Sequence, residues 1–170
     1  MKTFNKIAAF FCITVTLSLY AGQNKDLSIE AKVYDLLSKM TLEEKIGQMS
    51  QRHMGGGTET WEKDIAAGKV GSFLNAGNWK IKNKLQKIAV EKSRLSIPLI
   101  FGRDVIHGYQ TMLPIPIGMA SSFNPELLEK GSQMAAREAS ADGQHWTFAP
   151  MIDITRDPRW GRIAETLGED

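Results

Sequence analysis

The chain has 170 residues, of which 42% are hydrophobic, and its formal net charge is +2. This length and apolar content allow one domain with a buried core and exclude an intrinsically disordered chain. Lysine and arginine are interspersed with aspartate and glutamate, so no basic stripe is available to neutralise phosphates, and we expect no nucleic-acid partner.

The first residues have the layout of a signal peptide. Lys2 and Lys6 precede an apolar stretch at residues 7–20, and two small residues follow it. The stretch is shorter than the roughly 20 residues that span a bilayer as a helix. We therefore expect residues 1–22 to direct export to the periplasm or outside the cell, with no stable membrane insertion after removal; a buried first helix or a membrane anchor is the alternative. The only cysteine, Cys12, would leave with this segment, which excludes a disulfide, a thiolate metal site and a cysteine nucleophile.

Two helices and a flexible connection are expected next. Apolar residues at helical spacing predict a helix over residues 28–39. A second helix is expected from Thr41 to about Met49, because Thr41 and Glu44 have the spacing of a capping box. The glycine run at residues 55–57 lacks the Lys-Ser/Thr of a phosphate loop and follows a helix, so we interpret it as a flexible connection.

From residue 61 onward, predicted helices and strands alternate. Helices are expected over residues 61–67, 79–93 and 125–141, and short buried strands over residues 70–74, 98–102 and 146–149. The last helix is expected to start at Asn124 as N-cap, with Pro125 at the first helical position. This rhythm is typical of parallel βα units, in which binding sites lie after the C-terminal ends of the strands.

The helix predicted over residues 79–93 is rich in lysine. We expect these side chains to form a solvated outer face, with binding to a membrane surface as the alternative. The lysines are Lys80, Lys82, Lys84, Lys87 and Lys92.

A first polar cluster follows the strand at residues 98–102. The Asp104 carboxylate can accept hydrogen bonds from two neighbouring hydroxyls of a ligand, and such charge-assisted bonds are about twice as strong as neutral ones. An ion pair with Arg103 or a loop-shaping hydrogen bond is an equally good interpretation. Asp104 and His107 also resemble half of a metal site, but the residues that could complete it have no tight ligand spacing. Those residues are His145, Asp153 and Asp157.

A second polar cluster is the segment TRDPRWGRIAETLGED, residues 155–170. Each of its arginines is a rigid fork that can bind hydroxyls or carboxylates through two hydrogen bonds. Trp160 offers a flat apolar face that can pack on a sugar ring or inside the protein. Spacing alone does not choose among the arginines, and we expect one or two of them to pair with nearby carboxylates. The arginines are Arg156, Arg159 and Arg162, and the carboxylates are Asp153, Asp157 and Glu165.

Four motifs occur in order along the chain. They are EEKIGQM (residues 43–49), GRDVIHGYQTMLPIPIGMASSFNPELL (102–128), WTFAPMIDITRDPRWGR (146–162) and ETLGED (165–170). Together they resemble the N-terminal domain of glycoside hydrolase family 3, and most closely its exported bacterial β-glucosidases. The resemblance covers nearly all of residues 23–170, and the conjunction of the motifs is far more specific than any one of them.

The resemblance implies a fold and a set of site residues. The fold is expected to be α/β, a (β/α)8 TIM-like barrel. Asp104 takes the place of the aspartate that binds hydroxyls of the sugar in the first subsite. Arg162 takes the place of the second arginine of the RWGR motif, which also reaches that sugar. Supporting roles are expected for Glu165, Arg159, Trp160 and His107, and the resemblance implies no metal and no cofactor.

The resemblance also implies a mechanism. The family cleaves glycosides with retention: an aspartate nucleophile forms a glycosyl-enzyme, and a second carboxyl group acts as acid and then as base. The SDW-like motif of the nucleophile and the Lys-His pair that follows GED are absent from this sequence. Because a complete barrel takes about 250 residues, we expect residues 23–170 to be the N-terminal part of a truncated barrel domain. Alone, this part is expected to lack the catalytic pair, to be inactive and to be poorly soluble.

The sequence therefore predicts part of a retaining β-glycosidase. A β-glucosidase acting on an oligosaccharide or a β-glucoside is the favoured activity, and β-xylosidase and β-N-acetylglucosaminidase activities occur in the same family. A non-catalytic carbohydrate-binding remnant that keeps Asp104 and Arg162 is a rival hypothesis. A metal-dependent hydrolase on a similar barrel is the third.

Overall fold

The computed structural model describes residues 28–54 and 58–169, so the expected signal peptide and the glycine run lie outside the described residues. Contacts divide the chain into two compact units, residues 1–40 and residues 41–170. In the first unit, helix α2 (Ile29–Lys39) begins after Ser28, whose Oγ accepts a hydrogen bond from the Ala31 N–H at 3.2 Å. The helix predicted over residues 28–39 is confirmed.

The second unit is built on a parallel sheet of four strands in the order β1-β2-β3-β4. The strands are β1 (Gln51–His53), β2 (Ser72–Leu74), β3 (Ile100–Arg103) and β4 (Trp146–Thr147). Phe73 lies opposite Phe101 in the β2–β3 pair, and Gly102 lies opposite Trp146 in the β3–β4 pair. The predicted α/β class is confirmed, and the three expected strands are present within shorter bounds.

Strand β1 was not predicted, and the expected count of three strands is wrong. All three side chains of β1 are exposed and polar, so its sequence carries no hydrophobic pattern. The strand forms because its backbone pairs with β2, with Gln51 opposite Ser72 and His53 opposite Leu74. A short edge strand of this kind is defined by its partner, and the partner is distant in the sequence.

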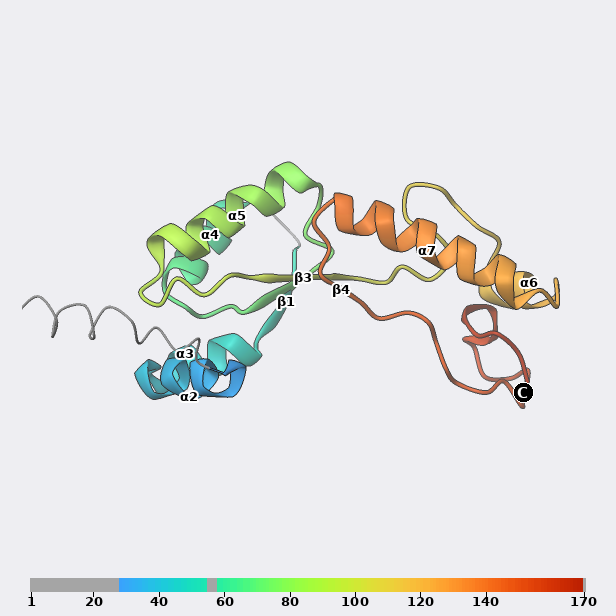
Figure 1. Cartoon of the computed structure of the whole chain (residues 1–170), viewed down its shortest axis with the longest axis horizontal. Helices are drawn as coiled ribbons and strands as arrows, with labels where there is room; N and C mark the ends of the chain where they lie inside the picture. The colour runs from blue at the N-terminus through green and yellow to red at the C-terminus, as the bar shows by residue number, and fades with distance from the viewer. Residues whose placement is uncertain (1–27, 55–57, 170) are drawn as a thin grey trace, which may run out of the picture. The chain divides into compact units, whose positions relative to one another are not determined.

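Helices precede and connect the strands. They are α3 (Leu42–Met49), α4 (Thr58–Ala66), α5 (Trp79–Lys92), α6 (Pro116–Ala120) and α7 (Pro125–Ala141), and a 3-10 turn, η1, spans Ile163–Glu165. In Figure 1, α4 and α5 lie on the same side of the strands. Helix α6 lies in a proline-rich stretch for which no helix was predicted, and Pro116 occupies its first turn, where a missing N–H costs nothing.

The predicted helix starts agree with the structure wherever a cap determines them. The Thr41 hydroxyl accepts from the Glu44 N–H at 3.2 Å, and the Glu44 carboxylate accepts from the Thr41 N–H at 2.9 Å, which confirms the capping box. Asn124 caps α7 by accepting from the Leu127 N–H at 3.1 Å. By contrast, α4 begins at Thr58, earlier than the predicted residue 61.

The hydrophobic core lies between the sheet and helices α4 and α5. Phe73 of β2 stacks on Phe101 of β3 with ring centroids 6.4 Å apart, and Trp61 of α4 meets the Phe73 ring edge-on at 5.4 Å. The buried residues of this core are Ile65, Val70, Phe73, Ala76, Leu85, Ile88, Ala89, Leu99 and Phe101. Close packing holds β2 and β3 in place, so the loops that leave their C-terminal ends start from fixed positions.

One lysine of α5 contradicts the expectation of a solvated lysine face. The Lys82 side chain is only 2% exposed, and its Nζ lies 2.7 Å from both the Oδ2 and the backbone carbonyl oxygen of Asp142 at the C-cap of α7. Lys82 shares an inward stripe with Leu85 and Ala89, three and seven residues further along the helix. A lysine on that stripe is buried with its neighbours and therefore requires a charged partner.

Asp142 is the centre of a network that joins three segments. Besides Lys82, it accepts hydrogen bonds from the Tyr109 hydroxyl in the loop after β3 and from the Trp79 N–H at the start of α5, the latter at 2.9 Å. Desolvation acts to raise the pKa of Asp142, but the hydrogen bonds from Lys82, Tyr109 and Trp79 outweigh it and hold the pKa below its ordinary value. The carboxylate is therefore ionised at neutral pH and ties α5, α7 and the loop together.

We expect Lys82→Met to destabilise the full-length protein strongly. Methionine keeps the apolar stem but leaves Asp142 without its cation, and breaking a buried pair costs about 3–5 kcal/mol. Lys84→Met is the matched control on the same helix, because Lys84 pairs with Glu62 at 2.6 Å while 54% exposed and an exposed pair contributes under about 1 kcal/mol. Urea unfolding checks both values, and equal effects of the two substitutions would contradict the assignment.

The network also predicts a loss of stability in acid. Because the folded-state pKa of Asp142 is lowered, its contribution to the free energy of unfolding is complete above its ordinary pKa of about 4 and is lost as pH falls through the lower folded-state pKa. The difference in unfolding free energy between the wild type and Asp142→Asn should therefore shrink between about pH 5 and about pH 2. A difference that stays constant over that range would argue against an ionised Asp142 in the network.

Candidate functional site

Asp104 lies directly after β3, at the C-terminal end of the strand, and its side chain is exposed. Within the described part of the chain, its carboxylate forms no hydrogen bond or ion pair with another side chain. Arg103 does not pair with it, because the Arg103 guanidinium lies over the Tyr109 ring, 5.0 Å from the ring centroid. The ion-pair interpretation of Asp104 is therefore wrong, and its oxygens face solvent.

The loop that follows Asp104 is held by its own hydrogen bonds. His107 Nδ1 lies 3.0 Å from the carbonyl oxygen of Leu113, and the Leu113 N–H donates back to His107 at 2.8 Å. Gly108 has a φ of +107°, and a Cβ there would lie 2.1 Å from the Thr111 carbonyl oxygen, so the turn requires glycine. The imidazole of His107 is thus used to shape the loop, and we infer a structural role for it.

Glu138 of α7 anchors the far side of the same loop. Its carboxylate accepts from the backbone N–H groups of Gln110 and Thr111, both at 2.8 Å, and from the Thr111 hydroxyl at 2.7 Å. These bonds, with the Thr111 backbone bond the largest cause, lower the pKa of Glu138. The sequence offered no signal for this contact, since Glu138 reads as an ordinary surface residue of a helix.

The arginines of the second cluster have distinct environments. Arg159 is 89% exposed and bound to Asp157, with Nε at 3.0 Å from Oδ1 and Nη2 at 2.5 Å from Oδ2. Arg162 is bound to Glu165, with Nε at 3.1 Å from Oε1 and Nη2 at 2.6 Å from Oε2. Arg156 is exposed and has no ion-pair partner among residues 28–54 and 58–169. The structure thus assigns the pairing that spacing could not.

Arg162 and Asp104 belong to one electrostatic environment. The pKa of the Arg162 guanidinium is raised first by the hydrogen bond to Glu165 and then by the charge of Glu165, and the charges of Asp153 and Asp104 add to this effect. The charges that act on Arg162 thus include those of side chains far from it in the sequence. Trp160, half-buried in the turn that Asp157 starts, lies between the two paired arginines in the chain.

The residues considered for a metal site do not lie together around a common point. His145 Nδ1 accepts a hydrogen bond from the Phe101 N–H at 3.1 Å, and its ring stacks on Phe101. Asp157 is occupied by Arg159. Within the described ranges, no three His, Cys, Asp or Glu side chains gather closely enough to hold a metal ion.

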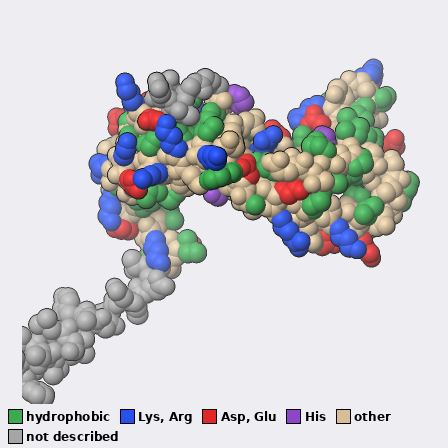
Figure 2. Space-filling view, turned by 90° about the horizontal axis from the view of Figure 1, so that it is seen from above, with side chains coloured by type: hydrophobic (Ala, Val, Ile, Leu, Met, Phe, Trp, Pro, Cys, Tyr) green, Lys and Arg blue, Asp and Glu red, His purple; other side chains and the backbone are tan. Residues whose placement is uncertain are grey.

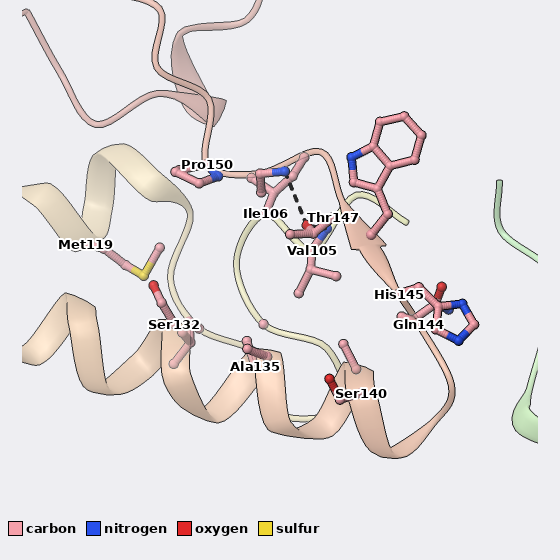
Figure 3. A pocket seen from close by; sticks show the side chains of 16 residues that line it. Val105, Ile106, Met119, Ser132, Ala135, Ser140, Gln144, His145, Thr147 and Pro150 are labelled. Carbon is pink, nitrogen blue, oxygen red and sulfur yellow. Dashed lines mark hydrogen bonds between the residues drawn. The ribbon is translucent and has the colours of Figure 1, made fainter. Parts of the chain in front are cut away.

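A mainly apolar cavity of about 300 Å³ lies between α7, the loop that follows Asp104 and the segment from β4 to Pro150. Figure 3 shows Ser132, Ala135 and Ser140 of α7 on one side, with Thr147 and Pro150 on the other. Neither Asp104 nor Arg162 lines it. The small residues at helical spacing on α7 could have indicated this hollow, but its chemistry differs from that of the polar cluster.

The surface and the helices bear on possible partners. Figure 2 shows Lys and Arg side chains scattered among Asp and Glu over the visible face. Among the residues that the structure describes, no helix has the length and apolar character needed to cross a membrane.

The chain is similar in sequence to several known proteins. The profile of the glycosyl hydrolase family 3 N-terminal domain matches residues 41–170. A periplasmic β-glucosidase of Salmonella typhimurium is 43% identical over 152 residues, which cover 86% of this chain and 20% of that protein. A putative β-xylosidase of Formosa agariphila is 36% identical, over 87% of this chain and 22% of its own. The chain therefore spans about a fifth of the length of these relatives.

Solved structures agree with the sequence matches. A β-glucosidase from Listeria innocua in complex with isofagomine has a TM-score of 0.73 and 40% identity, covering 85% of this chain and 21% of that one. A β-glucosidase involved in saponin metabolism from intestinal bacteria has a TM-score of 0.66 and 45% identity, covering 80% of this chain and 18% of its own.

Proposed function

Because the chain belongs to glycosyl hydrolase family 3, we propose that the full-length protein is an exported, retaining β-glycosidase that removes terminal β-D-glucosyl residues from oligosaccharides or β-glucosides. Asp104 and Arg162 form part of the subsite that holds the glucosyl unit. Export rests on the predicted signal peptide at residues 1–22 and on the similarity to a periplasmic relative. The substrate class rests on the β-glucosidases among the relatives.

The exposed carboxylate of Asp104, whose charge acts on Arg162, is the observation that carries this proposal. A carboxylate without a protein partner can accept hydrogen bonds from two adjacent sugar hydroxyls. Glu165 takes the Nε and Nη2 groups of Arg162, so the Nη1 group keeps two N–H donors for a ligand. One acceptor and one donor at the C-terminal end of a parallel strand suit a polyhydroxylated ligand.

The paired carboxylates of this region are unsuited to acid catalysis. A glycosidase acid must be protonated near neutral pH, which requires a raised pKa. The hydrogen bond from Arg162 lowers the pKa of Glu165, and the hydrogen bonds from Arg159 lower the pKa of Asp157. We therefore assign neither the nucleophile nor the acid/base to these residues, and propose that they hold their arginines in place.

A β-xylosidase is a second candidate, because a putative β-xylosidase is 36% identical to the chain. A xylosyl unit lacks the hydroxymethyl group of glucose, so the two activities share the hydroxyls that Asp104 and Arg162 are proposed to bind. Rates on aryl β-glucoside, β-xyloside and β-N-acetylglucosaminide distinguish the activities that occur in the family. Sugar binding without turnover of any of them would favour the non-catalytic alternative.

We expect Asp104→Ala and Arg162→Ala each to lower kcat/KM of the full-length protein for an aryl β-glucoside by about ten- to a hundredfold, because each leaves polar partners unpaired in a desolvated subsite. Arg159→Ala is the matched control from the same segment and should stay within about threefold, since Arg159 is 89% exposed and paired only with Asp157. Near-silent Asp104 and Arg162 variants together with a severe Arg159 variant would reverse the assignment.

Activity should also be indifferent to chelators. The proposed mechanism uses carboxyl groups and requires no metal ion. Steady-state rates before and after dialysis against EDTA measure this, with a zinc-dependent hydrolase as the positive control. A loss of activity that added metal restores would favour the metal-dependent hydrolase.

A further inference from the structure

Two buried threonines close the base of the segment that carries Arg162. Thr166 is 0% exposed and Thr155 is 7% exposed, and their Oγ1 atoms are in hydrogen-bond contact with each other. The Thr155 N–H also donates to the Gly168 carbonyl at 3.0 Å, and Met151 forms a parallel bridge with Thr166. The residues between the two threonines therefore form a loop whose ends are tied together.

Closing a loop with buried hydroxyl groups carries a free-energy cost. A hydroxyl out of water must be hydrogen-bonded, or its burial is unfavourable by a few kcal/mol, whereas a valine of the same shape needs no partner. A pair of such hydroxyls fixes a direction and a separation that apolar contact would leave adjustable. The hydrogen bond between the two threonine hydroxyls therefore fixes the positions of the two ends of the loop 156–165.

Thr166 connects the pair of threonine hydroxyls to Arg162. Its hydroxyl and its N–H both reach the Ile163 carbonyl, at 3.1 and 3.2 Å, and so close the 3-10 turn η1. Glu165, the last residue of η1, holds the Arg162 guanidinium by two hydrogen bonds. Turn η1 also contacts α6 (Figure 1), but none of its residues is fully buried.

We propose that the Thr155–Thr166 hydroxyl pair is a positioning device for Arg162, acting through η1 and Glu165. The pair fixes the C-terminal end of the turn at Thr166, the turn sets where the Glu165 carboxylate lies, and the carboxylate sets the direction of the guanidinium. This inference rests on the proposed function, in which Arg162 binds the glucosyl unit. Neither threonine touches the sugar in this scheme.

Substitutions in the full-length protein test the role, with an aryl β-glucoside as substrate. Thr166→Val removes the hydroxyl and should lower kcat/KM by about tenfold or more, because small misplacements of a substrate-binding group are costly. Thr166→Ser keeps the hydroxyl and should stay within about threefold of the wild type. In the Arg162→Ala background, Thr166→Val should cause no further loss, since the group that it positions is already absent.

A stability control separates positioning from folding. The double variant Thr155→Val, Thr166→Val replaces both hydroxyls by groups of similar shape and should recover most of any loss in Tm, while its kcat/KM stays as low as that of Thr166→Val. Full activity in that double variant, or an equal effect of Thr166→Val with and without Arg162, would overturn the inference. No turnover by the wild type would refute the proposed function and this role with it, whereas normal turnover with a silent Thr166→Val refutes this role alone.

Discussion

The buried ion pair between Lys82 and Asp142 is the interaction on which the rest of the second unit depends. The Lys82 side chain is only 2% exposed, and a buried ammonium group needs an anion beside it. The ion pair with Asp142 therefore holds the C-terminal end of α7 against α5. The same carboxylate accepts from Tyr109, which draws the loop after β3 into the contact. The apolar core positions β2 and β3, and this charged contact adds α7 and the Asp104 loop to them.

The polar residues of the site divide into those that build loops and those that are left unpaired. Glu138 and His107 satisfy backbone groups of the Asp104 loop, and Thr155 and Thr166 close the Arg162 loop. Each loop is thereby ordered without consuming the Asp104 carboxylate or the Nη1 edge of Arg162. Groups that remain unpaired on an ordered backbone are available to a ligand without reorganisation of the protein.

Sequence reasoning succeeded where structure is decided by neighbouring residues. The capping box of Thr41 and Glu44 and the Asn124 cap of α7 are local contacts, and both occur as predicted. It failed where a distant partner decides: β1 exists only by pairing with β2, and Lys82 is buried only because Asp142 meets it. The pairing of the arginines is an intermediate case. The partners of Arg159 and Arg162 are close to them in the sequence, but the spacing of the charged residues allowed other pairings as well.

The distinction between paired and unpaired carboxylates also limits what this region can do chemically. Arg162 and Arg159 keep Glu165 and Asp157 ionised, respectively. These carboxylates can therefore orient the guanidinium groups, but they are poor proton donors at neutral pH. Asp104 is exposed, and its carboxylate makes no hydrogen bond or ion pair with another described side chain. These properties are those expected of the hydroxyl-binding role that we propose for the cluster. Under the proposed function, the two carboxyl groups that break the glycosidic bond are therefore not assigned to Glu165, Asp157 or Asp104.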